Sequence, residues 1–168
     1  MSEIRSALHR LCEHVGITDG YRDVWGRDHR TTDETRLALL KAMSVIDEVA
    51  DAEAALRARE EREWRSRLPP VVVRGEQTLP LRWHVCIEES AAYQSLPWTI
   101  TLESGEALSG EIRPADFEGV TRRAIDGAGW VKVAFQLRHR LPTGYHRFHV
   151  RFPGAVERSM TLIVVPSR

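Results

Sequence analysis

The chain has 168 residues, enough for one ordinary domain or two small ones, and its 24 basic and 24 acidic side chains cancel. Because no net charge attracts nucleic acid or an anionic membrane, neither is expected as a partner. The two cysteines, Cys12 and Cys86, lie in unrelated segments, and the sequence has neither a basic-then-apolar leader nor an apolar run of membrane-spanning length. We therefore expect a cytoplasmic protein with two free thiols.

Residues 1–67 are predicted to be helical, because they contain no proline and are rich in Ala, Glu, Arg and Leu. Apolar residues recur at helical spacing at Leu8, Leu11 and Val15. Gly16 is well placed to end this first helix in the left-handed conformation. A second helix is expected from Thr31, which forms a capping-box pattern with Glu34, and a third is expected from about residue 47 to residue 65.

Between the first two helices, residues 21–26 hold two aromatic side chains and a glycine outside any periodic pattern. We interpret this segment as an ordered loop that Tyr21 and Trp25 pin to the protein. The helical part ends at Leu68-Pro69-Pro70, because two prolines cannot continue a helix and they favour extended geometry in the residue before them.

From Val71 onward, short apolar or alternating runs separated by turn residues indicate β-strands. The expected strands are residues 71–73, 79–87, 98–102, 107–112, 131–137, 145–152 and 160–165. Residues 113–127 are weakly patterned and are expected to form a loop or a poor edge strand. The predicted fold class is therefore α+β by segment. About three helices in residues 1–67 precede an antiparallel immunoglobulin-like β-sandwich of about six or seven strands in residues 68–168.

The sequence indicates no catalytic residue, no metal site and no cofactor. It has no glycine-rich phosphate loop, no Cys-x-x-Cys pair and no Gly-x-Ser-x-Gly elbow. A metal cluster of His139, His146 and His149 is not favoured, because His146 and His149 on one strand would face opposite sides. Glu88 and Glu89 are adjacent and would also point apart on a strand, so they cannot flank one glycosidic bond.

Two of the five tryptophans are candidates for a substrate-binding role. An exposed indole can cover the apolar face of a sugar ring, and Trp98 and Trp130 each lie near the start of a strand, where they could reach the rim of a sandwich. The alternative is that both indoles belong to the core, which is the commoner position for this residue type in small domains.

Two segments carry a resemblance to a known family. Residues 21–40, with their Tyr-x-Asp-x-Trp-Gly sequence before Glu34-Thr35, closely resemble the leading segment of bacterial 4-α-glucanotransferases, the amylomaltases. Leu141-Pro-Thr-Gly-Tyr-His146 and Leu162-Ile-Val-Val-Pro166 resemble the end of the β-sandwich region that precedes the catalytic (β/α)₈ barrel in longer bacterial members of that family. The motifs stand in the family's order, although residues 71–127 carry none.

The resemblance implies a parent enzyme that transfers α-1,4-glucan segments in maltodextrin and glycogen metabolism. Its nucleophilic aspartate, acid/base glutamate and stabilising aspartate would lie on the barrel. The sequence ends at Arg168, where the barrel would begin, so no acidic residue here inherits those roles and no turnover is expected. Two hypotheses follow. The chain packs on the catalytic barrel as a structural region, or it is a glucan-binding module that uses aromatic residues at its rim to hold maltodextrin or glycogen.

Overall fold

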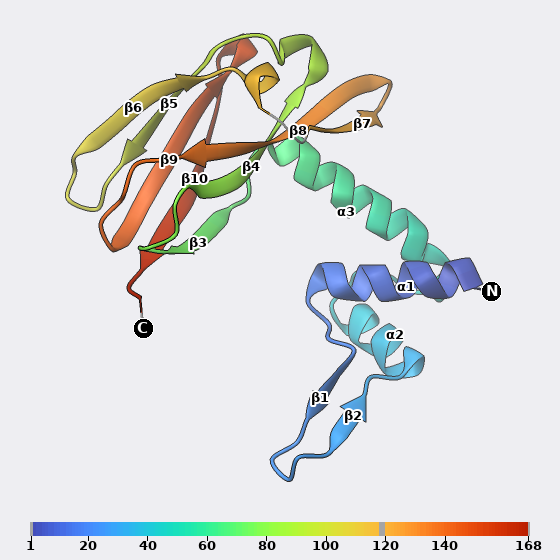
Figure 1. Ribbon diagram of the computed structural model, residues 1–168. Helices are drawn as coiled ribbons and strands as arrows, with labels where there is room; N and C mark the ends of the chain where they lie inside the picture. Colours follow the sequence, from blue (N-terminus) through green and yellow to red (C-terminus); the bar gives the residue numbers. More distant parts are fainter. Residues whose placement is uncertain (1, 118–119, 168) are drawn as a thin grey trace. The chain divides into compact units, whose positions relative to one another are not determined.

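The computed structural model describes residues 2–117 and 120–167, and the chain divides into two compact units between residues 62 and 63 (Figure 1). The elements of the first unit are α1 (Ser2–Val15), a hairpin of β1 (Gly20–Arg22) and β2 (Asp28–Arg30), α2 (Asp33–Ala42), a 3₁₀ turn (Val49–Asp51) and most of α3 (Ala52–Ser66). The three helices predicted from the sequence are thus present. No helix in the described ranges is long and apolar enough to cross a membrane.

The ends of the helices follow local sequence signals. Gly16 adopts φ +87°, and the N–H of Ile17 donates to the carbonyl of Cys12 at 2.8 Å, as a left-handed helix terminator requires. Helix α2 begins one residue later than the capping-box pattern indicated, because the hydroxyl of Thr32 accepts from the N–H of Thr35. Helix α3 begins at Ala52 rather than near residue 47, since the residues before it form the 3₁₀ turn.

The prediction that Tyr21 and Trp25 pin an ordered loop is wrong. Residues 20–30 form a hairpin, and Tyr21 is 65% exposed and Trp25 81% exposed. The apolar core of this unit excludes both; it consists of Ala7, Leu8, Leu11, Cys12, Leu40, Ile46, Ala52 and Leu56. Hydrogen bonds of the Asp23 carboxylate, rather than burial of the rings, hold the hairpin in shape.

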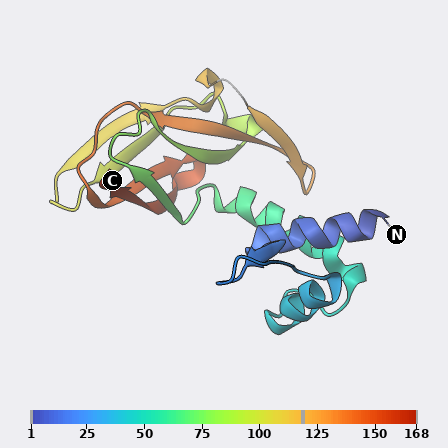
Figure 2. The ribbon, with the colours of Figure 1, turned by 60° about the horizontal axis from the view of Figure 1, so that its bottom comes forward.

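The second unit is a sandwich of two sheets, which form two layers in both views (Figures 1 and 2). The larger sheet has the order β3 (Val71–Gly75), β10 (Val156–Val165), β9 (Gly144–Phe152), β5 (Leu96–Thr101), β6 (Ala107–Ile112). The smaller sheet has the order β4 (Leu81–Glu88), β8 (Ala128–Leu137), β7 (Thr121–Ile125). Neighbouring strands are antiparallel except β3 and β10, which are parallel.

This strand order is that of an immunoglobulin-like sandwich. Strands β4, β8 and β7 take the places of strands B, E and D, and β10, β9, β5 and β6 take those of G, F, C and C′. The predicted fold class is confirmed, with β7 added to the seven expected strands. Strand β7 lies in residues 113–127, for which we expected a loop or a poor edge strand. The structure shows that β7 is an edge strand of the smaller sheet.

The core between the sheets is centred on aromatic rings. Trp83 on β4 lies edge-on to Phe148 on β9, with 4.9 Å between ring centroids, and Phe135 on β8 lies within 5.2 Å of Phe148. Strands β4 and β9 occupy the positions that a disulfide joins in antibody domains. Here an aromatic pair fills that place, so the sandwich is held by packing.

Candidate interaction surface

The Leu141–His146 motif forms a rigid turn around one buried histidine. The His146 side chain is 2% exposed; its Nε2–H donates to the carbonyl of Pro142 at 2.8 Å, and its Nδ1 accepts from the N–H of Glu103 at 3.3 Å. The carboxylate of Glu103 accepts in turn from the N–H of Tyr145 at 3.0 Å. Gly144 has φ +144°, and a Cβ at this position would collide with that carboxylate. These contacts fix the backbone that carries Tyr145.

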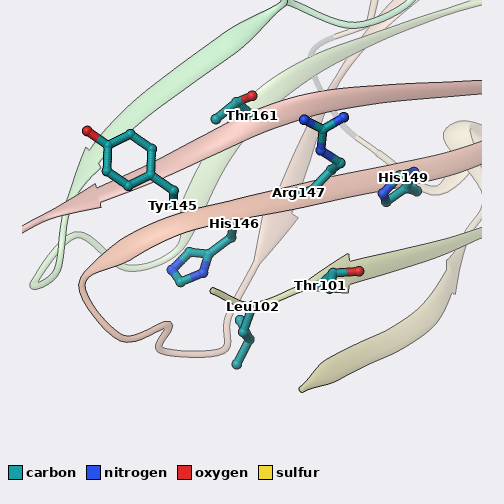
Figure 3. Close-up of a pocket in the computed structure, with 7 residues that line it drawn as sticks. All are labelled: Thr101, Leu102, Tyr145, His146, Arg147, His149 and Thr161. Atoms are coloured by element: carbon teal, nitrogen blue, oxygen red, sulfur yellow. The ribbon is translucent and has the colours of Figure 1, made fainter. Parts of the chain in front are cut away.

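A groove lies beside this turn on the outer face of the five-stranded sheet. Its volume is about 500 Å³, and its lining residues come from three neighbouring strands (Figure 3). Thr101 on β5 is paired with Arg147 on β9, which is paired with Thr161 on β10. A second hollow of about 340 Å³ continues along β9 and shares His149 with the first. The two hollows therefore meet at His149 on the outer face of β9.

An apolar patch adjoins the groove. It consists of outward-facing side chains from β3, β9 and β10, and we call it the docking face: Val71, Val73, Tyr145, Ile163 and Val165. In the sheet, Tyr145 lies opposite Ile163, and Ile163 lies opposite Val73, so the patch is contiguous across three strands. Val71 is 48% exposed, Val73 50% and Tyr145 64%. Adjacent apolar side chains that stay exposed on a sheet are typical of a surface that another polypeptide covers.

The two tryptophans predicted as binding residues lie elsewhere. Trp98 is half-buried on β5 and packs against the sandwich core, with its ring so close to Gly110 that a Cβ there would lie 2.6 Å from the ring edge. Trp130 is 7% exposed, and the guanidinium of Arg67 covers its ring at 5.0 Å. In this conformation neither indole offers a free face to a sugar ring, and the binding role of both stays a prediction.

Trp130 belongs to a small second core at the end of α3. Trp64, Cys86 and Ile125 complete this cluster, and all four side chains are buried. Burial raises the pKa of the Cys86 thiol to about 11. Both cysteines of the chain are free thiols, as the sequence predicted. The thiol of Cys86 therefore acts as a small apolar group of this core.

The histidines and glutamates that the sequence analysis considered as metal ligands or as a catalytic pair are separated from one another in the structure. His146 is buried and His149 is exposed on the same strand, which confirms that they face opposite sides. Glu88 pairs with Arg67, whereas Glu89 lies in a 3₁₀ turn and pairs with Arg122. In residues 2–117 and 120–167, no three His, Cys, Asp or Glu side chains are grouped so that they could hold a metal ion.

Sequence reasoning missed the docking face. The run Val71-Val72-Val73 correctly indicated a strand, but an unbroken apolar run is typical of a strand that is buried on both sides. Only Val72 is buried, and the other two valines face outward. The signal that could have found the face is Tyr145, an exposed aromatic residue that directly follows the Pro-Thr-Gly turn of the Leu141–His146 motif.

Taken together, the structure is a helical segment followed by an immunoglobulin-like sandwich that carries an exposed apolar face. Residues 67–166 match the MalQ N-terminal beta sandwich domain family, and the chain belongs to that family. This match confirms the resemblance to the amylomaltases that the sequence motifs carry.

Known proteins similar to the chain agree with this assignment. The chain is 28% identical to a 4-alpha-glucanotransferase of Mycobacterium bovis and to one of Mycobacterium tuberculosis, and the matched segment covers 99% of this chain and 22% of each enzyme. It thus spans about a fifth of these relatives. In structure it is similar to the amylomaltase from Corynebacterium glutamicum, with a TM-score of 0.77 and 24% identity over 98% of this chain and 23% of that one, which shows the common fold.

Proposed function

We propose that this chain works as the non-catalytic N-terminal region of a 4-α-glucanotransferase, and that its docking face packs against the catalytic part of that enzyme. The observation that carries the proposal is the docking face itself. Its five apolar side chains lie together on strands β3, β9 and β10, and the polar groove borders them. An apolar centre with a polar rim is the usual anatomy of a protein interface.

The glucan transfer itself belongs to a different segment in this proposal. The relatives that are named 4-alpha-glucanotransferases are more than four times as long as the segment that matches this chain. We therefore assign to the catalytic remainder both the transfer of α-1,4-glucan segments and the role of partner. The sandwich domain of the proposal comprises residues 68–168, since α3 ends at Ser66.

We also propose a cytoplasmic location, which the two free thiols support, because the oxidising compartments outside the cytoplasm favour disulfides. The proposal assigns no substrate contact to Trp98 or Trp130. A role for them in glucan binding would require both side chains to leave their present packing against Gly110 and Arg67.

Hydrogen exchange tests the docking. We expect amides of β3 and β10 to exchange more slowly in the full-length enzyme than in the isolated region, because a packed partner excludes water from the strands beneath it. Strand β6, at the other edge of the same sheet, supplies the internal control. Equal exchange of β3 and β10 in both proteins would contradict the docking proposal.

A further inference from the structure

Two apolar side chains at the tip of the β1–β2 hairpin are almost fully exposed to solvent. Val24 is 90% exposed and Trp25 is 81% exposed. The other four tryptophans lie in the apolar cores: Trp64, Trp83 and Trp130 are each at most 7% exposed, and Trp98 is half-buried. Trp25 is thus the most exposed of the five tryptophans, all of which lie in the described ranges.

Hydrogen bonds within the hairpin fix the backbone that carries Trp25. One carboxylate oxygen of Asp23 accepts from the N–H groups of Trp25 and Arg27, each at 2.9 Å, and the other oxygen lies 2.9 Å from Nε2 of His29. Gly26 has φ +81°, and its carbonyl accepts from Nε of Arg22. Because the turn is already ordered, a ligand that binds to the indole has little loop entropy to overcome.

The surroundings of the indole are polar and nearly balanced in charge. Arg22 lies 3.6 Å from Asp28, and both side chains are more than two-thirds exposed. Tyr21, 65% exposed, stacks on His29 across the hairpin, with 5.0 Å between the ring centroids. Hydrogen-bond donors and acceptors therefore stand on both strands of the hairpin whose tip carries the indole.

We propose that Trp25 stacks on a pyranose ring of an α-glucan, with the side chains of Arg22 and Asp28 placed for its hydroxyl groups. A sugar ring has an apolar face of C–H groups edged by hydroxyls, which matches an open indole edged by charged side chains. The ligand class rests on the proposed function, since the relatives are named for their action on α-glucans.

A protein partner fits this site less well. An indole offers on the order of 200 Å² of surface, whereas each side of a standard protein interface buries about 800 Å². Beside Trp25, only Val24 adds apolar surface at the tip, and charged residues surround the two. The area is suited to one or two sugar rings.

Titration of the chain with maltoheptaose tests the proposal through the fluorescence of tryptophan and the indole N–H resonances. We expect a saturable change with a dissociation constant on the order of millimolar, as is usual for a small exposed contact. One indole resonance should shift, and it should be the one that is absent in Trp25→Ala. That variant should lose at least about tenfold in affinity while Trp25→Phe keeps a part of it.

Val24→Ala is the matched control, because it changes the neighbouring exposed side chain and leaves the indole in place. The melting temperature of Trp25→Ala should lie within about 3 °C of that of the unchanged chain, since its side chain is exposed. The proposal is overturned by no saturable change up to tens of millimolar, by a change that persists in Trp25→Ala, or by an equal response to a β-1,4-linked cello-oligosaccharide. The hydrogen-exchange test of docking is independent of maltoheptaose, so failure here leaves the proposed function in place.

Discussion

Replacing Phe148 by alanine tests whether the aromatic core holds the sandwich together. Its ring is 0% exposed and lies within 4.9 Å of Trp83, 5.2 Å of Phe135 and 6.2 Å of Trp98, measured between ring centroids. The change removes a buried ring and leaves a cavity between the two sheets. A loss of about 3–5 kcal/mol in the free energy of unfolding is therefore expected. For a unit of this size, the melting temperature should fall by roughly 15–25 °C.

Urea unfolding followed by tryptophan fluorescence measures this loss, because Trp83 and Trp98 lie beside the ring. Phe148→Leu keeps most of the volume and should cost no more than about 1.5 kcal/mol. Tyr145→Ala alters an exposed aromatic residue on the same strand and should stay within about 0.5 kcal/mol. If Phe148→Ala lost less than about 1 kcal/mol, the inter-sheet packing described here would be refuted.

Three further predictions concern other parts of the chain. With its pKa raised to about 11, Cys86 should react with a disulfide reagent at pH 8 only after unfolding, since about one thiol in a thousand is ionised. Gly110→Ala should cost about 1–3 kcal/mol and change the fluorescence of Trp98, whose ring occupies the space of the new methyl group. A hydrogen bond from His9, and further bonds from arginines, hold the pKa of Asp33 below its ordinary 3.8. Its contribution to stability is present above the unfolded pKa and is lost as the pH falls through the lower folded value. Asp33→Asn should therefore flatten the stability profile in that acid range. Reaction of the native Cys86 thiol, an unchanged Trp98 signal or an unaltered acid profile would each count against the corresponding contact.

The architecture of the sandwich could be predicted from the sequence because its central strands have one buried face. On β8, the side chains of residues 131, 133, 135 and 137 are buried, and the alternation is plain in the sequence. Strand β7 was harder to predict, since Arg122 and Arg123 are consecutive and the strand is recognised by its pairing with β8. An edge strand of this kind has no periodic apolar signal.

The positions of the aromatic residues depended on contacts that local sequence does not contain. Trp130 is covered by Arg67, which is far away in the chain, and the burial of Trp98 depends on the absence of a side chain at Gly110. We expected Trp25 to anchor a loop by burying its ring, because aromatic side chains are usually largely buried. The carboxylate of Asp23 performs that task instead and leaves the indole exposed.

The most direct test of the account is calorimetric titration of this chain with the separately produced catalytic part of the enzyme. We expect saturable binding that Val73→Asp and Ile163→Asp weaken at least about tenfold, because each places a charge in the centre of the docking face. Ser109→Asp, on the exposed outer face of β6, should leave the affinity unchanged. Binding that tolerates both substitutions in the docking face, or no binding of the unchanged chain, would contradict the central claim.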